Sequence, residues 1–328
     1  MIELCTRSLA LICCNDLMQE EGFHTLLKRM PKGGNFAGIL WDRRNTGGSQ
    51  HAYTEKWHSK GEPEIHADDL AGLICLLTSE GGGKKRPAIL VGNSSGARVS
   101  LLCAAMHPEA VAGVVLMNLT GGHAAAEFLA DTYHLQFARV ASSSGLDRVF
   151  KTAHFRTCLA KGGAVGGIEK SLIDVSAEEF IRAQTAWGEW MARTADWPVV
   201  GIDEATMRKV EAPALVIHNF VPEDDMHTRA VSERVASILR KKDGKETLSD
   251  GFPRCSLMLS DYQHFPQWTA RMTSFFEDVW ERNGKLDAKT ESESLCNTFL
   301  PSVQAGIEGT TAAVQESEKE PSRISAGL

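Results

Sequence analysis

The segment from Pro87 to Cys103 constrains the fold of this chain more than any other. An apolar run of strand length ends at Gly92, and from Ala97 onward the apolar residues take helical spacing. The segment therefore predicts a strand, a tight turn and a helix, in that order.

Ser94 lies in this turn, within the sequence Gly92-Asn93-Ser94-Ser95-Gly96. So tight a turn forces the serine into a strained backbone conformation, and it closes only where the residues two before and two after carry almost no side chain. Gly92 and Gly96 meet this condition. The turn would set the Ser94 hydroxyl over a helix N-terminus, whose free amides and dipole favour a developing negative charge. The alternative is a glycine-rich turn in which a serine only caps the helix.

The five-residue sequence resembles the nucleophile elbow, G-x-S-x-G, of the α/β-hydrolase superfamily, and the resemblance extends over residues 8–282. It implies an α/β fold of the α/β-hydrolase type, a mostly parallel sheet flanked by helices, with a helical cap insertion. The first strands are apparently missing, because eight residues precede the first expected strand where the family usually places two strands. Either the sheet is shorter at that edge, or the sequence begins inside a longer ancestor.

Strand and helix patterns alternate along the rest of the chain, as expected for a mostly parallel sheet. Strands are expected at residues 9–14, 36–41, 111–118, 213–219 and 255–259, and helices at residues 17–30, 65–78, 124–141, 146–160, 177–195, 229–239 and 269–280. We therefore divide the chain into a first core part at residues 1–122, a helical cap or lid at 123–205, a second core part at 206–283 and a disordered tail at 284–328.

The expected cap is rich in aromatic residues, which could line a pocket above Ser94 or pack the cap on itself. Packing is the expected role for any single one of them. They are Phe128, Tyr133, Phe137, Phe150, Phe155, Phe180, Trp187, Trp190 and Trp197.

A polar turn follows the strand expected at residues 36–41 and begins at Asp42. It resembles the segment D-x-R-G-x-G-x-S of the superfamily, with Asn45 in place of the first glycine. The resemblance implies that Asp42 and the arginines of this loop are tied into hydrogen bonds under the active site. A structural role is therefore expected here in preference to contact with a substrate.

A serine hydroxyl needs an imidazole base and a carboxylate that orients it. The superfamily supplies them in the order serine, acid, histidine. The loop at residues 220–227 resembles the acid loop of the superfamily, which implies Asp224 as the acid, with Asp225 as the alternative. The segment at residues 261–268 resembles the histidine segment of the superfamily, which implies His264 as the base. Of the other histidines, His227 is set aside because it lies in the acid loop itself.

An oxyanion hole needs two backbone amides that point at the carbonyl oxygen of the substrate. One is expected from Ser95, and the other from Asn15 or Asp16 after the first strand. The superfamily usually shows His-Gly in that loop, whereas this chain has no glycine there and brings the negative charge of Asp16 close to the oxyanion.

These features predict a cofactor-independent serine hydrolase that acts on a small carboxylic ester or lactone through an acyl-enzyme. Two alternatives stay open: hydrolysis of a carbon–carbon bond beside a ketone, as in a diketone, and a non-catalytic protein that binds a ligand with the same fold. No metal or cofactor is expected, because the cysteines and histidines lack ligand spacing.

Composition narrows the partners and the compartment. The net charge of −7 argues against a nucleic-acid or anionic membrane surface, so a small-molecule substrate is expected. No apolar stretch is long enough for a membrane span. The 8 cysteines include no C-x-x-C pair and are expected to be buried thiols in a reducing compartment, which predicts a cytoplasmic location. The oligomeric state is left open.

Overall fold

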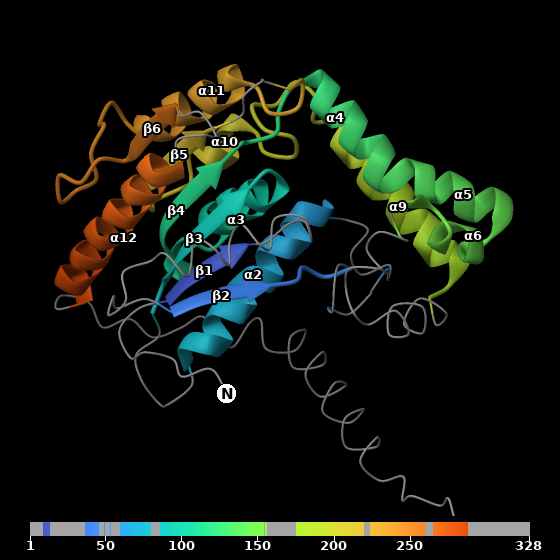
Figure 1. Ribbon diagram of the computed structural model, residues 1–328, viewed down its shortest axis with the longest axis horizontal. Coiled ribbons are helices and arrows are strands. Elements are labelled where there is room, and N and C mark those ends of the chain that lie inside the picture. Colours follow the sequence, from blue (N-terminus) through green and yellow to red (C-terminus); the bar gives the residue numbers. More distant parts are fainter. Residues whose placement is uncertain are drawn as a thin grey trace, which may run out of the picture. The chain divides into compact units, whose positions relative to one another are not determined.

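The computed structural model describes residues 9–13, 37–45, 49, 53, 60–79, 86–153, 155, 175–219, 224–259 and 265–287 (Figure 1). Most of the segment predicted as a disordered tail lies outside these residues, as does the helix expected at residues 17–30.

Six strands form one sheet in the order β2-β1-β3-β4-β5-β6, and every neighbouring pair is parallel. The strands are β1 (Leu9–Cys13), β2 (Ala37–Trp41), β3 (Ala88–Asn93), β4 (Val111–Met117), β5 (Ala214–His218) and β6 (Cys255–Leu259). The predicted parallel sheet is therefore confirmed. The chain leaves β1 toward β2 on one side and continues from β3 on the other, so the strand order reverses between β1 and β3. In open α/β sheets, ligands bind beyond the carboxyl ends of the strands at such a point.

The helices between and after these strands follow the predicted pattern. They are α2 (Glu62–Ser79), α3 (Ser95–Met106), η2 (Pro108–Ala110), α4 (His123–Ala130), η3 (Asp131–Leu135), α5 (Gln136–Ser144), α6 (Leu146–Phe150), α9 (Ala177–Ala192), α10 (Glu204–Met207), α11 (Arg229–Arg240) and α12 (Phe265–Asp287). The helix expected at residues 124–141 is interrupted by the π-helical turn η3, and α12 extends past the expected end at residue 280.

Alternate side chains of the strands point to opposite faces of the sheet, as the period of a strand requires. Leu90 of β3 belongs to an apolar cluster that includes residues of α2, α3 and α11, whereas Ile89 and Val91 belong to a second cluster with residues of α12. Figure 1 shows these helices around the sheet. Helix α12 comes close because Gly113 of β4 has no side chain: a Cβ there would lie 3.1 Å from the Cγ2 atom of Val279. The central strands β3, β4 and β5 are thus buried on both faces, which explains their apolar runs.

The helices between β4 and β5 have apolar clusters of their own, and several of the expected cap aromatics pack in one of them. Phe137, Phe155, Phe180 and Trp187 are buried there together with Ile65 of α2. Phe128 and Tyr133 differ, because their side chains are 47% and 38% exposed. The preference for packing is therefore confirmed for those four aromatics and is wrong for Phe128 and Tyr133.

The cysteines only partly follow the sequence expectation. Cys103 and Cys255 are buried thiols, and burial raises the pKa of Cys255 to about 12. Cys75 of α2 is disulfide-bonded, so the expectation that all cysteines are thiols is wrong at this residue. In the part of the chain that the structure describes, no helix has the length and apolarity needed to cross a bilayer.

Candidate active site

Ser94 sits at the sharp turn between β3 and α3, as predicted. Its φ is 55° and its ψ is −120°, a strained combination for a residue with a side chain. Its backbone N–H donates to the carbonyl of Met117 at 2.9 Å, which ties the turn to the end of β4. A Cβ on Gly92 would lie 2.2 Å from the carbonyl oxygen of Gly96, so the chain can close here only with glycine at residue 92.

Three asparagines join the carboxyl ends of neighbouring strands beside this turn. The side-chain amide of Asn118 donates to Oδ1 of Asn93 at 2.8 Å, and Oδ1 of Asn118 accepts from the backbone N–H of Asn219 at 3.0 Å. All three residues are buried. These bonds hold the ends of β3, β4 and β5 in register, and thereby fix the serine turn relative to the loop that follows β5.

Asp224 and Asp225 lie in that loop and differ in their surroundings. Asp225 is exposed, whereas Oδ1 of Asp224 accepts from the backbone N–H groups of Met226 and His227, each at 2.8 Å. Burial alone would raise the pKa of Asp224, but hydrogen bonds from the His227 side chain and from both backbone N–H groups outweigh it and lower that pKa. Asp224 is therefore an ionised, fixed carboxylate at neutral pH.

His227 connects this carboxylate to the serine. Its Nδ1 lies 3.0 Å from both carboxylate oxygens of Asp224, and its Nε2 lies 2.8 Å from the Oγ of Ser94. The carboxylate requires a proton on Nδ1, so Nε2 of the neutral ring is an acceptor and the Ser94 hydroxyl donates to it. An imidazole placed in this way can remove the proton of a serine that attacks a carbonyl carbon.

The sequence predicts Ser94 and Asp224, which the structure joins through the imidazole of His227, a histidine that the sequence does not favour. His264 and Asn15 lie outside the described residues. Ser95 is the first residue of α3, where backbone N–H groups have no acceptor within the helix. The spacing Asp-x-x-His of residues 224–227 was the signal for His227, because it allows one turn to hold both side chains.

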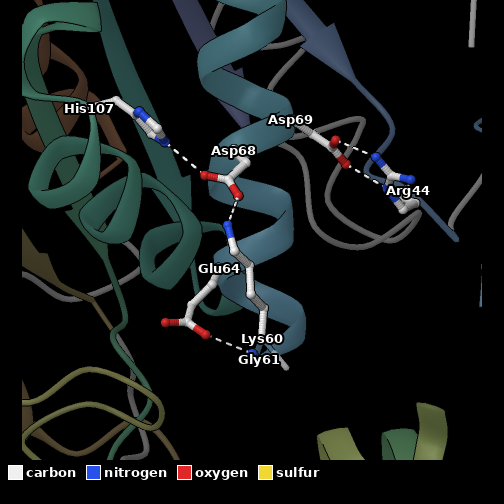
Figure 2. A network of polar contacts seen from close by, with 7 residues as sticks. All are labelled: Arg44, Lys60, Gly61, Glu64, Asp68, Asp69 and His107. Atoms are coloured by element: carbon white, nitrogen blue, oxygen red, sulfur yellow. Dashed lines mark hydrogen bonds and ion pairs between the residues drawn. The ribbon is translucent and has the colours of Figure 1, made fainter. Parts of the chain in front are cut away.

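The loop after β2 has the structural role that was expected. The guanidinium of Arg44 binds Asp69 of α2 with two hydrogen bonds of 2.8 and 2.5 Å (Figure 2). The hydroxyl of Ser49 donates to the carbonyl of Asp42. Asn45, which stands in place of the family's glycine, has a φ of 65°, and asparagine tolerates this conformation better than most residues.

The neighbouring Asp68 fastens α2 to other parts of the core. It accepts from His107, at the end of α3, at 2.9 Å and also binds Lys60, while Glu64 accepts from the backbone N–H of Gly61 at the start of α2 at 2.6 Å (Figure 2). Burial alone would raise the pKa of Asp68, but its bonds to His107 and Lys60 lower it. The face of α2 in Figure 2 is thus structural.

A second set of ionisable side chains lies where the first turn of α2 meets η3, with Glu62 half-buried and Arg43, His66 and His134 buried. Oε2 of Glu62 lies 3.5 Å from Nε2 of His134, and Nη1 of Arg43 lies 3.4 Å from Nδ1 of His66. Burial alone would raise the pKa of Glu62, but the neighbouring His134, His66 and Arg43 hold it well below its usual range. Burial lowers the pKa of His66 to about 4 and that of Arg98 to about 10. Among the described residues, no group of three acidic, histidine or cysteine side chains could hold a metal ion.

Comparison with known proteins agrees with this fold. Residues 20–277 match the model of the alpha/beta hydrolase family. Because the match spans more than half of the chain, this protein belongs to the alpha/beta hydrolase family. The predicted resemblance and fold class are thereby confirmed.

One curated relative is the 2-(acetamidomethylene)succinate hydrolase of Mesorhizobium japonicum, which is 36% identical over 98 residues. That match covers 30% of this chain and 31% of the relative. Two solved structures are also similar. The structure of E-2-(acetamidomethylene)succinate hydrolase has 21% identity and a TM-score of 0.45, covering 82% of this chain and 91% of the other. The enol-lactonase of Burkholderia xenovorans LB400 has 16% identity and a TM-score of 0.45, covering 83% and 92%.

Proposed function

We propose that this protein is a serine hydrolase that cleaves a small carboxylic ester or lactone through an acyl-enzyme on Ser94. The observation that carries the proposal is the hydrogen bond of 2.8 Å between Oγ of Ser94 and Nε2 of His227, whose Nδ1 lies 3.0 Å from the Asp224 carboxylate. A hydroxyl within hydrogen-bond distance of an imidazole that a carboxylate orients is the arrangement that an activated serine needs.

In the first half of the proposed reaction, a histidine removes the proton of Ser94 as Oγ forms a bond to the carbonyl carbon. The carbonyl oxygen takes the electron pair of the broken π bond, and its negative charge is held by the backbone amide of Ser95 and, as predicted from sequence, that of Asn15. When the carbon–oxygen bond to the leaving group breaks, the imidazolium gives its proton to the departing oxygen. A linear ester thus releases an alcohol, whereas a lactone opens and keeps it.

In the second half, the imidazole takes a proton from a water molecule whose oxygen attacks the acyl carbon. The bond to Oγ of Ser94 then breaks, the serine recovers its proton, and a carboxylic acid leaves. Two histidines compete for the role of base: His264, expected from the family resemblance, and His227, which contacts Ser94.

Fluorophosphonate labelling followed by intact mass tests the proposal, because this probe forms a covalent bond only with an activated serine. We expect one equivalent on the wild type, none on Ser94→Ala, and full labelling of Ser143→Ala, in which an exposed serine of α5 is removed as a matched control. Folded wild type that takes up no probe would contradict the proposal and favour the ligand-binding alternative.

The substrate class is tested with panels of esters, lactones and diketones. Ester or lactone turnover that disappears in Ser94→Ala supports the proposal, whereas turnover of diketones alone would favour carbon–carbon hydrolysis. The panel includes 2-(acetamidomethylene)succinate, which the matched relative hydrolyses according to its name.

A cytoplasmic location is part of the same proposal. The buried thiols Cys103 and Cys255 are compatible with it, whereas the disulfide at Cys75 is of a kind that is rare in the cytosol. Cell fractionation shows whether the protein is cytoplasmic, and thiol counting on the purified protein shows whether Cys75 is oxidised.

A further inference from the structure

We propose that Glu62 and His134 are positioning residues of the Ser94 site: they join the first turn of α2 to the helices between β4 and β5, and α9 connects this contact to the turn that holds Asp224. Two residues outside the serine turn thereby influence the reaction of the proposed hydrolase, on which this inference rests. A continuous series of contacts between described residues supports it.

His134 makes the first of these contacts. It belongs to the π-helical turn η3, and its side chain is buried. Nδ1 of its ring lies 2.8 Å from Oε1 of Gln184 in α9, and Nε2 lies 3.5 Å from Oε2 of Glu62 in α2. Both ring nitrogens therefore face oxygen atoms, and an imidazolium can donate to both. Single π-helical turns are rare and often occur at functional sites, which agrees with a role for η3 beyond packing.

The charges at this contact hold α2 and η3 together. Burial alone would raise the pKa of Glu62, but His134, His66 and Arg43 hold it well below its usual range, so Glu62 is ionised at neutral pH. Removal of one member of a buried ion pair leaves the charge of the other without compensation. A glutamine at residue 62 would therefore keep the shape of the side chain but lose the attraction.

Helix α9 is held against the same two elements by close packing. A Cβ on Gly188 of α9 would lie 2.6 Å from Cγ of Leu135 in η3, so α9 and η3 approach this closely because residue 188 has no side chain. A Cβ on Gly61, the residue before α2, would lie 2.4 Å from ring atoms of Trp190 in α9. The position of α9 is therefore determined by both η3 and the start of α2.

The end of α9 in turn determines the surroundings of Asp224. Met191 of α9 belongs to an apolar cluster with Val200, and the side chain of Met226 packs against that cluster. The backbone N–H of Met226 donates to Oδ1 of Asp224 at 2.8 Å, and the carbonyl of Met226 accepts from Gly121 at 3.3 Å. A shift of α9 would therefore move Met226, and with it the carboxylate that the proposed reaction needs in a fixed place.

Hydrogen exchange tests this series of contacts directly. The amides of interest are the backbone N–H groups of Met226 and His227, which donate to Asp224. We expect them to exchange about tenfold faster in folded Glu62→Gln than in wild type, because a change along such a series of contacts weakens the coupling between its ends. Glu178→Gln, which removes the carboxylate of an exposed ion pair within α9, is the matched control and should exchange as wild type does. Unchanged exchange in Glu62→Gln would overturn the inference, whether or not the protein is a hydrolase.

Ester turnover separates positioning from direct contact with the substrate. On esters with different acyl groups, Glu62→Gln should lower kcat by about tenfold and leave KM within about twofold of wild type. A KM that rises for one acyl group alone would place Glu62 against the substrate and overturn the inference. The double variant Glu62→Gln/His134→Gln should lose no more activity than the weaker single variant, since both residues act through one contact. Additive losses would also overturn it.

Gly61→Ala decides the question if Glu62→Gln does not fold. The added methyl group must displace the ring of Trp190 and changes no charge. We expect the same faster exchange at Met226 and His227 and the same lower kcat, and wild-type values for both would contradict the role of α9. Fluorophosphonate labelling of the wild type runs in parallel: folded protein that takes up no probe would refute the hydrolase itself, whereas labelled protein with unchanged exchange in the variants would refute only the positioning role.

Discussion

Gly92 and Gly96 approach each other so closely at the serine turn that a Cβ on Gly92 would lie 2.2 Å from the carbonyl oxygen and 2.4 Å from the carbonyl carbon of Gly96. Both atoms belong to the backbone, so the clash cannot be relieved by rotation of a side chain. The hydroxyl of Ser94 depends on this approach for its position at the end of the sheet.

We expect Gly92→Ala to lose fluorophosphonate labelling and about 3 kcal/mol of unfolding free energy, because the turn must open to admit the methyl group. Urea unfolding followed by fluorescence measures the loss. Gly113→Ala is the matched control: its Cβ would meet side-chain atoms of Val279 at 3.1 Å, which can shift, and the cost should be smaller. Equal stability of Gly92→Ala and wild type would contradict the geometry of the turn.

The two aspartates of the acid loop should differ in their effect on turnover. Asp224 binds the imidazole of His227, whereas Asp225 is exposed. Asp224→Asn should lower kcat/KM for esters by about 10³–10⁴-fold, since an amide no longer fixes the tautomer of the ring. Asp225→Asn should leave kcat/KM within about twofold. A comparable loss in both variants, measured under the same conditions, would refute the assignment of the acid.

Substitution of Asn118 should lower both the free energy of unfolding and the reactivity of Ser94. Asn118→Ala removes the donor to Asn93 and the acceptor of the Asn219 N–H, and leaves these buried groups without the partner described above. We expect a loss of about 1–3 kcal/mol in the free energy of unfolding and slower labelling of Ser94.

Asn118→Asp is the informative companion of this variant. The aspartate keeps an oxygen that accepts from the Asn219 N–H, but it no longer donates to Asn93. The free energy of unfolding should therefore fall, and the backbone amides at the end of β3 should lose more protection than those at the end of β5. Hydrogen exchange of the amides at residues 92–95 and 218–219 measures the difference. Unchanged protection in both variants would show that the asparagines do not fix the strand ends.

The buried His66 should make the free energy of unfolding depend on pH between the pKa values of this histidine in the folded and unfolded chain. Its pKa falls from 6.5 to about 4 on folding, mainly through burial, so between these values the unfolded chain binds a proton that the folded chain does not. This contribution is fully present above about pH 6.5 and is lost as the pH falls toward 4. Urea unfolding at a series of pH values from 7 to 4.5 should therefore show a slope for wild type that is shallower in His66→Gln.

Above pH 4.5, the contribution of His66 to the pH dependence is separated from the contributions of the carboxyl groups. The pKa values of the carboxyl groups Glu62, Asp68 and Asp224 are lowered on folding, so their contributions are lost only below their ordinary values of 4.5, 3.8 and 3.8. His123→Gln, which changes an exposed histidine, should keep the slope of wild type. The same slope in His66→Gln as in wild type would refute a neutral, buried His66.

The sheet, its flanking helices and the serine turn could be predicted because local sequence determines them. The apolar runs Ala88–Val91 and Ala214–Ile217 identify β3 and β5 as strands of a parallel sheet, and glycines two before and two after Ser94 identify the turn. Asn45 stands in place of the family's glycine and has a φ of 65°, in the left-handed region that glycine adopts readily.

Contacts between distant residues could not be read from local sequence. The hydrogen bond from Ser94 to His227 spans 133 residues, and the sequence contains other histidines at loop positions. The resemblance to the family favours His264 by its position in the sequence, and His264 lies outside the described residues. The asparagines that end β3, β4 and β5 did leave a signal, since each strand is completed or followed by the same residue type, but their pairing needs the strand order.

Because Asp224 and His227 belong to one short turn, the carboxylate and the imidazole cannot leave the serine independently. A displacement of residues 224–227 would therefore change the distances from Ser94 to the imidazole and to the carboxylate together. The orientation of the imidazole and its distance from the hydroxyl of Ser94 are thus set by the same few residues.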